Sequence, residues 1–409
     1  MDLNDMGKND WSNFNHILCI RPDNMGDVLM TQPAIRALKQ QKKGRKITLL
    51  TSKMGAKIGR LLPEIDKIIE FDVPWIKTDD QNGESAVQQL VKRLKAEQFD
   101  AAAIFTNFSQ NAQAPAMICY LAGISQILAY SRTNPYQLIN HWVPDSEPFL
   151  FPAHGVKRQI NMVSTVGADT ADKQLALEPE KKAKKTALQK LKKEGVNPEK
   201  PWLILHPGVS EAKREYPVEM YGKAAEMLNA NGRQIVITGL ECENNLAAGV
   251  ASSSKAESFN MAGKLSLKEF IALISLAPVI ISNNTASVHI AAAVQTPVVD
   301  LYARTNPEHT PWMVKHRTLY FDVPQSLQSS NATLVHTTPN KLALHPQPED
   351  IVTAVHELTE DIPLEKSNIS SEKMSWSNEG INGTYTHLQS KRGAGRNAYQ
   401  PLLSKLKSI

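Results

Sequence analysis

The sequence alternates short apolar runs with segments of helical spacing, and it begins this alternation twice. The apolar runs are continuous, so the strands that they predict bury both faces. Such strands form parallel sheets, because the helices that connect parallel strands cover both faces of the sheet. The pattern therefore predicts an α/β fold with two Rossmann-like domains.

The first series of elements occupies residues 16–131. It predicts strands at residues 16–22, 46–52, 67–72, 101–108 and 126–131, and helices at residues 28–43, 55–62, 83–98 and 114–123. Between residues 141 and 201 the pattern falters. Prolines stand at positions 144, 148 and 152, and a helix with Ile160 and Val163 and then a lysine-rich helix follow. We interpret this stretch as the passage between domains.

The second series predicts strands at residues 202–206, 233–239, 279–282 and 297–302, with helices at 217–232, 241–254, 266–277 and 285–294. We therefore predict an N-terminal domain of residues 1–175 and a C-terminal domain of residues 176–345. This division suits a chain of 409 residues. Residues 346–362 are predicted to form a last helix, and the polar residues 363–409 a flexible tail.

The cysteines and the lack of long apolar runs favour a cytoplasmic location. Cys19, Cys119 and Cys242 stand far apart and form no CxxC pair, so neither a disulfide framework nor a zinc site is predicted. No apolar run is long enough to cross a bilayer, and residues 1–16 are polar and unlike a signal peptide. Any membrane contact is therefore expected to be peripheral, on the cytoplasmic face of the inner membrane.

Positive charge is concentrated in two places, although the net charge is only +5. Residues 179–195 hold seven lysines, and the last twenty residues hold five Lys or Arg and no acid. Such runs are most often solvated faces or tails. The alternative is that they attract an anionic membrane surface or an anionic glycolipid.

The first candidate site is the turn Asn24-Met25-Gly26-Asp27, which joins the first predicted strand to the first predicted helix. Ligands of parallel sheets bind outside the carboxyl ends of the strands, where this turn lies. Gly26 permits a close approach of the backbone. Asp27 has three alternative roles: a general base, a ligand of a substrate hydroxyl, or the N-cap of the helix that follows.

The second candidate site follows the strand at residues 202–206. Gly208 and Ser210 form a small-residue loop, and Lys213 and Arg214 come just before a helix. Backbone N–H groups and cations that converge in this way suit a phosphate group. The alternative is a surface loop with ordinary basic residues. Nothing in this pattern implies a metal.

The third candidate site, residues 282–289, joins a buried strand to an alanine-rich helix. The start of a helix offers unpaired N–H donors and partial positive charge, which suit a diphosphate. Asn284 or Thr285 could instead only cap the helix, and His289 could only pack within its first turns.

Several familiar functions lack their motifs in this sequence. There is no GxGxxG after a strand, and Gly263-Lys264-Leu265-Ser266 lacks the upstream glycine of a P-loop. There is also no GxSxG or HExxH motif. Aromatic residues make up 6% of the chain and no strand resembles an RNA-binding motif, so nucleic-acid binding is not expected.

Five segments together resemble the lipopolysaccharide heptosyltransferase family, glycosyltransferase family 9. They are ILCIRPDNMGDVLMTQPAIRALK, LILHPGVSEAKREYP, IVITGLECE, AGKLSLKEFIALI and SNNTASVHIAAAVQTPVVDLYA, and their order and spacing over residues 16–320 also match. The resemblance implies a GT-B architecture, with an N-terminal acceptor domain and a C-terminal nucleotide-sugar domain facing a central cleft. It further implies that the last helix, near residues 349–359, crosses back to the N-terminal domain.

The resemblance also implies roles for individual residues. Asp27 matches the family's proposed general base. Arg214 stands at the basic position, before an aromatic-proline pair, that contacts the donor diphosphate. Glu243 stands where an acidic residue binds the ribose of the nucleoside.

In the third site, Thr285, Ala286 and Ser287 match the family's backbone phosphate cradle, and His289 matches its histidine. Two residues depart from the common pattern. Asn284 stands where many members have Asp, and Ala286 stands where many have Gly. The first change removes a charge, and the second adds a methyl group beside the expected phosphate.

The implied reaction is an inverting transfer of heptose from ADP-heptose to a lipopolysaccharide core or a related anionic surface glycan, without a metal cofactor. Asp27 would take the proton of the acceptor hydroxyl while the second and third sites stabilise the departing nucleoside diphosphate. Two alternatives remain open at this point. One is a GT-B enzyme that uses another nucleotide sugar, such as an epimerase or a different transferase. The other is a non-catalytic glycan-binding or assembly protein.

Overall fold

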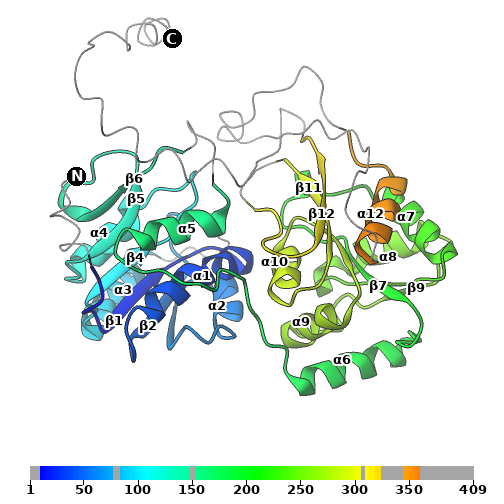
Figure 1. Ribbon diagram of the computed structural model, residues 1–409, viewed down its shortest axis with the longest axis horizontal. Helices are drawn as coiled ribbons and strands as arrows, with labels where there is room; N and C mark the ends of the chain where they lie inside the picture. The colour runs from blue at the N-terminus through cyan, green and yellow to red at the C-terminus, as the bar shows by residue number, and fades with distance from the viewer. Residues whose placement is uncertain (1–9, 77–82, 148–152, 305–308, 324–343, 360–409) are drawn as a thin grey trace, which may run out of the picture. The chain divides into compact units, whose positions relative to one another are not determined.

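Two six-stranded sheets, both with every pairing parallel, form the framework of the chain (Figure 1). The computed structural model describes residues 10–76, 83–147, 153–304, 309–323 and 344–359. The sheets confirm the predicted α/β fold. We call residues 10–164 the N-terminal half and residues 181–359 the C-terminal half.

The N-terminal sheet has the strand order β3-β2-β1-β4-β5-β6. Its strands are β1 (His16–Ile20), β2 (Lys46–Thr51), β3 (Lys67–Glu70), β4 (Ala101–Ile104), β5 (Ile127–Ser131) and β6 (His141–Pro144). The helical elements are α1 (Met25–Gln40), α2 (Lys53–Gly59), α3 (Glu84–Glu97), α4 (Gln113–Leu121), η2 (Tyr136–Leu138) and α5 (Gly155–Ser164). The order of the strands reverses between β1 and β4, so the ends of these two strands mark the switch point.

The C-terminal sheet has the order β12-β11-β10-β7-β8-β9, with its switch point between β10 and β7. Its strands are β7 (Trp202–His206), β8 (Gln234–Ile237), β9 (Ser258–Asn260), β10 (Ile280–Asn283), β11 (Val298–Ala303) and β12 (His316–Phe321). The helical elements are α6 (Lys181–Lys193), η3 (Ala212–Arg214), α7 (Val218–Ala230), η4 (Glu241–Glu243), α8 (Asn244–Ser252), α9 (Leu267–Leu276), α10 (Ala286–Ala293) and α12 (Pro348–Thr359).

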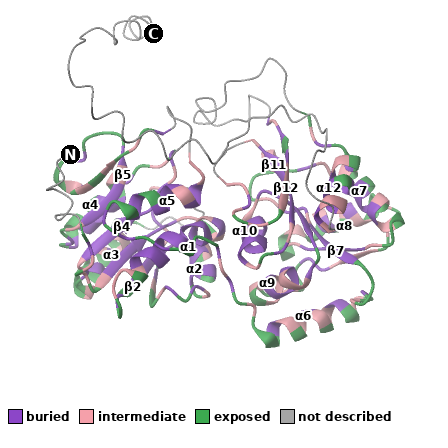
Figure 2. Cartoon of the chain, in the orientation of Figure 1, coloured by how far each residue is buried: buried purple, intermediate pink, exposed green. Residues whose placement is uncertain are grey.

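Strands β4 and β10 are buried along their whole length, and β1 and β7 are buried except at His16 and His206; Figure 2 shows the sheets of both halves largely in purple. Helix α1 is buried on nearly every side, because it packs against α2, α5 and α10. Buried residues of α1 and α10, among them Val28, Leu29, Val288 and Ile290, belong to one hydrophobic cluster. Burial of this apolar surface holds the start of α1 against α10.

The lysine-rich segment forms the amphipathic helix α6. Ala183, Ala187 and Leu191 recur at intervals of four residues and are buried, and α6 packs against α9. Lys190 reaches Glu269 of α9, with 2.8 Å between Nζ and Oε2. The remaining lysines of the helix are exposed or half-buried, which fits a solvated face.

Three strands were not predicted: β6, β9 and β12. Each is an edge strand of its sheet, and none is buried along its whole length. A prediction that rests on continuous apolar runs misses such strands, because one side of an edge strand is open to water.

The last helix does not cross back to the N-terminal half, so this part of the prediction is wrong. Helix α12 packs on α7, β11 and β12. Its apolar residues Ile351, Val355 and Leu358 share one face, which joins the hydrophobic cluster of the C-terminal sheet. Arg233 Nη2 also donates to Thr359 Oγ1 at 2.9 Å. The predicted tail, residues 363–409, lies outside the described residues.

Among the described residues, no helix combines the length and the apolar character that a membrane span requires.

Candidate functional site

The three predicted sites all lie at the carboxyl ends of strands beside the two switch points. The first follows β1, the second follows β7 and the third follows β10. The switch point of an open parallel sheet is the usual place for a ligand, because the loops part there in opposite directions. The topology therefore gives each half one edge at which a ligand is expected.

Asp27 lies inside the first turn of α1 and does not cap the helix. The helix begins at Met25, and Asn24 takes the N-cap position without a capping hydrogen bond from its side chain. The cap alternative for Asp27 is therefore wrong. The Asp27 side chain is 20% exposed and forms an ion pair with Arg21.

Arg21 holds two carboxylates at the end of β1. Its Nε lies 3.0 Å from Asp23 Oδ2, and its Nη2 donates to Asp27 Oδ1 at 2.7 Å. Burial raises the pKa of Asp23 to about 6, although Arg21 opposes this rise. Burial also acts to raise the pKa of Asp27, but Arg21 and His309 outweigh it and hold that pKa below its usual value. Asp27 is therefore ionised at neutral pH.

Gly26 meets the C-terminal half directly. A Cβ atom on this residue would lie 2.8 Å from His289 Cδ2 and 3.6 Å from the Cα of Ala286. No side chain fits in that space without displacing His289, which explains the glycine. The contact brings the Asp27 turn next to the start of α10.

The start of α10 is built from small neutral groups. Thr285 occupies the N-cap position, and its hydroxyl lies 2.7 Å from the Ser287 hydroxyl. Ser287 Oγ is in turn 2.6 Å from Ser282 Oγ. His289 is buried, with no hydrogen-bond partner for Nδ1, and burial lowers its pKa to about 3. His289 is thus neutral, and its ring closes the space beside Gly26.

Asn284 supports the loop that follows β11 and does not cap α10. Its Nδ2 donates to the His309 carbonyl at 3.0 Å and lies 3.5 Å from Asp300 Oδ2. Burial raises the pKa of Asp300 well above its ordinary value. The Asn284 amide therefore connects the end of β10 to His309, whose ring lies next to Asp27.

His309 is the C-terminal half's contribution to the pocket around Asp27. Its Nε2 is 4.0 Å from Asp27 Oδ1, and burial lowers its pKa to about 4 despite the nearby carboxylate. The charge of Arg214 acts in the same direction on this pKa. Arg214 therefore lies close enough to the pocket for its positive charge to lower the pKa of His309.

The second predicted site comes together only in part. Lys213 Nζ and Arg214 Nε lie 3.1 and 3.3 Å from Glu211 Oε2. Ser210 is exposed. The loop after β7 also contacts β10, because Asn283 Nδ2 donates to the Pro207 carbonyl at 2.7 Å.

Glu243 lies against Gly208. A Cβ atom at position 208 would overlap the Glu243 carboxylate. Glu243 Oε2 also accepts a hydrogen bond from the backbone N–H of Leu240 at 2.7 Å. The carboxylate is therefore fixed at the end of β8, beside the end of β7.

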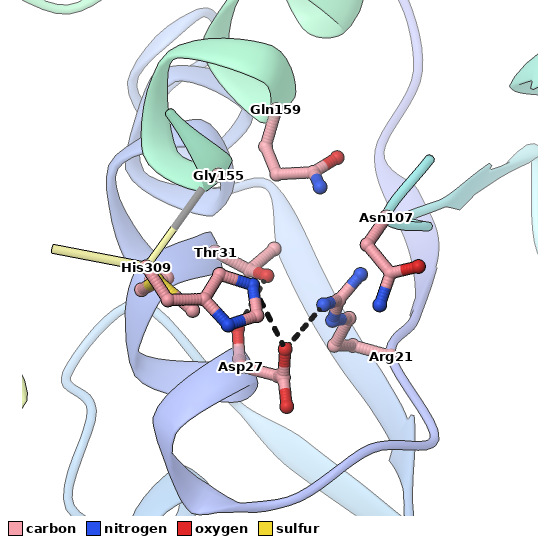
Figure 3. Close-up of a pocket in the computed structure, with 8 residues that line it drawn as sticks. Arg21, Asp27, Thr31, Asn107, Gly155, Gln159 and His309 are labelled. Atoms are coloured by element: carbon pink, nitrogen blue, oxygen red, sulfur yellow. Dashed lines mark hydrogen bonds and ion pairs between the residues drawn. The ribbon is translucent and has the colours of Figure 1, made fainter. Parts of the chain in front are cut away.

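The pocket also contains residues that the sequence prediction missed. Figure 3 shows them around one space, and the lining consists of Arg21, Asp27, Met30, Thr31, Asn107, Gly155, Gln159 and His309. Arg21 precedes the predicted turn by only a few residues, and Asn107 stands just after β4, so the strand-end rule could have indicated both. Gln159 and His309 come from distant segments and carry no comparable signal.

A family model described as glycosyltransferase family 9 (heptosyltransferase) matches residues 87–335. This range includes the second and third sites, whereas Asp27 precedes it. Lipooligosaccharide heptosyltransferase 2 of Haemophilus influenzae is 26% identical over 313 residues, which cover 72% of this chain and 85% of that protein.

Two solved structures share the fold. A glycosyltransferase family 9 protein from Veillonella parvula superposes with a TM-score of 0.68 at 16% identity, over 86% of this chain and 98% of that one. The Escherichia coli ADP-heptose lipopolysaccharide heptosyltransferase II superposes with a TM-score of 0.63 at 20% identity, over 84% and 98%. These likenesses confirm the GT-B fold.

Proposed function

The chain belongs to glycosyltransferase family 9, the heptosyltransferase family, and from that premise we propose that it transfers a heptose from ADP-heptose to a lipopolysaccharide core or a related surface glycan. The transfer inverts the anomeric carbon in this proposal. The names of the relatives support the choice of donor and acceptor class. We also propose that the reaction takes place in the cytoplasm, with the enzyme in peripheral contact with the inner membrane.

One observation carries the proposal: the carboxylate of Asp27 in the N-terminal half lies beside the N-terminus of α10 in the C-terminal half, where we expect the diphosphate to bind. Gly26 lies so close to α10 that a Cβ atom on it would be 2.8 Å from His289 Cδ2 and 3.6 Å from the Cα of Ala286, and Asp27 is the next residue along the chain. An acceptor hydroxyl at Asp27 would thus lie close to a sugar whose diphosphate rests on α10. Such proximity converts a reaction between two molecules into one within a complex.

Asp27 acts as the general base in this proposal. Its carboxylate is ionised at neutral pH, because Arg21 and His309 keep its pKa low. Asp27 takes the proton of the acceptor hydroxyl while the hydroxyl oxygen bonds to the anomeric carbon and the bond to the diphosphate breaks. A positioned base contributes about 10²–10⁴-fold to such a rate.

The departing ADP is stabilised from the C-terminal half. Arg214 supplies positive charge, and the first N–H groups of α10, at Ala286 and Ser287, supply donors to the β-phosphate. Glu243 binds the ribose hydroxyls of the nucleoside in this proposal. We propose that these groups serve without a metal cofactor.

The most informative experiment is a screen of nucleotide sugars. ADP-heptose should raise the melting temperature more than GDP- or UDP-sugars at equal concentration, because stabilisation grows as RT ln(1 + [L]/Kd). Transfer is then measured with the best donor and a truncated lipopolysaccharide acceptor. Preference for a GDP- or UDP-sugar would contradict the proposed donor, and donor binding without transfer to any glycan would contradict the proposed reaction.

A further inference from the structure

Helix α6 carries five lysines on the side that faces away from the protein. Ala183, Ala187 and Leu191 are buried, on the side that packs against α9. Because the helix has 3.6 residues per turn, its opposite side presents the exposed residues Lys181, Lys182, Lys185, Lys192 and Lys193. Figure 2 shows α6 mostly in green and pink, the colours of exposed and half-buried residues. We call these five lysines the outer face of α6.

No nearby carboxylate balances the outer face. The sequence holds no acid between Glu180 and Glu194. Both of these flanking carboxylates pair with lysines outside the helix: Glu180 Oε1 lies 2.5 Å from Lys268 Nζ, and Glu194 Oε2 lies 2.6 Å from Lys264 Nζ. Among the described residues, the one lysine of α6 that forms an ion pair is Lys190, on the side of α9. The outer face therefore has no anionic partner in the part of the chain that the structure describes.

The placement of these lysines is unfavourable for the helix itself. Lys181 and Lys182 stand at the start of α6, and its first turn contains no acid. Positive charge at that end opposes the helix dipole, which favours anions there. Lys181 and Lys185 are also four residues apart, and like charges at this spacing repel each other. A charged face that destabilises its own helix and has no partner within the fold indicates an anion that comes from outside.

The surface of an anionic bilayer suits the outer face better than other anions do. The 13 residues of α6 spread the lysines over about 20 Å, which is too wide for a single phosphate group. The helix contains no arginine for bidentate phosphate contacts and no aromatic residue for base stacking, so nucleic acid is a poorer match. Lysines clustered on an amphipathic helix attract anionic lipid headgroups, and this attraction requires no fixed geometry.

We propose that the outer face of α6 adsorbs the enzyme to the anionic lipid headgroups of a membrane. The inference rests on the proposed function in one respect, since it names the surface for the peripheral membrane contact at which a lipid-linked acceptor would be met. The apolar side of α6 is already used against α9. The contact is therefore electrostatic adsorption and not insertion of the helix, and salt weakens it.

The test is cosedimentation of the full-length enzyme with lipid vesicles. One set contains phosphatidylcholine alone, and the other also contains about 30% phosphatidylglycerol, whose headgroup is anionic. The enzyme should bind the anionic vesicles and not the neutral ones. Binding should be lost at about 0.5 M salt, because screening then acts over only a few ångströms. Equal binding to both kinds of vesicle, or binding to neither, would overturn the inference.

Variants locate the binding on α6. Changing all five lysines of the outer face to glutamine should weaken binding to anionic vesicles at least about 100-fold, since each lysine near such a surface contributes about fivefold. Changing the same five to arginine keeps the charge and should keep the binding. The matched control lowers the net charge equally by changing five exposed lysines of the N-terminal half to glutamine, and it should bind nearly as the wild type does: Lys43, Lys46, Lys57, Lys92 and Lys95.

Melting temperatures show whether the variants are folded, and glutamine on the outer face should not lower them, because the repulsion at the start of α6 is relieved. Unchanged vesicle binding in the outer-face variant, or an equal loss in the control, would contradict the inference. So would tighter binding to a DNA duplex of mixed sequence than to anionic vesicles at the same ionic strength.

ADP affinity and transfer to a soluble truncated acceptor, measured in the same samples, separate this failure from failure of the proposed function. If the outer-face variant binds ADP and binds vesicles as the wild type does, the docking surface alone is wrong. If the wild type binds anionic vesicles through α6 but binds neither ADP nor ADP-heptose, the docking surface stands and the proposed function is wrong.

Discussion

The two halves share a parallel α/β architecture but place different chemistry at their switch points. In the N-terminal half, the segment after β1 carries full charges: Arg21 is paired with Asp23 and Asp27. In the C-terminal half, the segment after β10 carries neutral groups. The Ser287 hydroxyl is hydrogen-bonded to the hydroxyls of Ser282 and Thr285. The buried Nδ1 of His289 has no hydrogen-bond partner.

This difference suggests a division of labour. Charges that are paired within the protein hold a base in its ionised form and in a fixed position. Neutral donors at a helix start carry little charge of their own and suit a ligand that brings its charge, such as a diphosphate. The same fold can thus carry the chemical step on one half and hold the donor on the other.

The largest effect on the rate of transfer is expected from a change in the charged segment after β1. Asp27→Asn keeps the shape of the side chain and removes the base, so the rate of transfer should fall about 10²–10⁴-fold. The measurement is kcat with saturating donor and acceptor. Asp66→Asn is a suitable control, because Asp66 forms an exposed ion pair with Lys39 outside the pocket. Wild-type turnover in Asp27→Asn would remove this residue from the mechanism.

The next effect concerns the contact between the halves. Gly26→Ala places a Cβ 2.8 Å from His289 Cδ2, so the His289 ring, the turn or α10 must shift. Since a misplacement of about 1 Å can cost about 10²-fold in rate, we expect a loss of that order in kcat/KM. Gly249→Ala is the matched control, because its Cβ would meet only Val218 Cγ1 at 3.6 Å. Equal activity of the two variants would show that the contact is unimportant for catalysis.

A third effect is a dependence of stability on pH that comes from His154. Its Nδ1 accepts from the Val156 N–H at 3.2 Å, and its Nε2 lies 2.9 Å from the Thr310 carbonyl, so the neutral ring joins the two halves. Burial lowers its pKa to about 4, while the unfolded chain binds the proton near the ordinary value. Stability from this residue is therefore complete above about pH 6.5 and declines as pH falls toward 4.

Between pH 7 and pH 5, His154 alone should lower the free energy of unfolding by up to about 2 kcal/mol. Urea denaturation at the two pH values measures the change. His154→Asn cannot titrate, so its stability should change less over this range than that of the wild type. If the free energy of unfolding of His154→Asn falls between pH 7 and pH 5 by as much as that of the wild type, His154 is not the cause of the pH dependence.

The smallest effect is expected at the ends of β7 and β8 in the C-terminal half. Gly208→Ala places a Cβ on the Glu243 carboxylate, which must then move away from the proposed ribose position. We expect ADP affinity to fall about tenfold, the cost of one hydrogen bond to a charged group. Isothermal titration with ADP measures it, again with Gly249→Ala as the control. Undiminished ADP affinity would place the nucleoside elsewhere.

Much of the fold could be predicted from the sequence because the central strands are continuous apolar runs. The missed strands β6, β9 and β12 lie at sheet edges, where water on one side permits polar residues such as His141 and Arg317. The path of α12 was predicted wrongly, since its apolar face is equally compatible with either half. Only the packing of Ile351 and Leu358 decides the matter.

The candidate site could be predicted only where its residues are neighbours in the sequence. Gly26 and Asp27 stand together after β1, and their turn was identified. His309 reaches Asp27 from a loop 282 residues later, and Gln159 reaches the same pocket from α5. These long-range contacts depend on how the two halves pack, and a local sequence pattern does not predict that packing. Asp27 was also assigned an N-cap alternative, because capping and catalysis use the same residue type at the same kind of turn.

The division of labour is tested most directly by one comparison of donor affinities. ADP-heptose is titrated into the wild-type enzyme, Asp27→Asn and Arg214→Ala by isothermal calorimetry. The account predicts that Asp27→Asn binds the donor at least as tightly as the wild type. Arg214→Ala should bind about 10–100-fold more weakly, because it loses a charge-assisted contact with the diphosphate. Loss of donor binding in Asp27→Asn, with normal binding in Arg214→Ala, would contradict it.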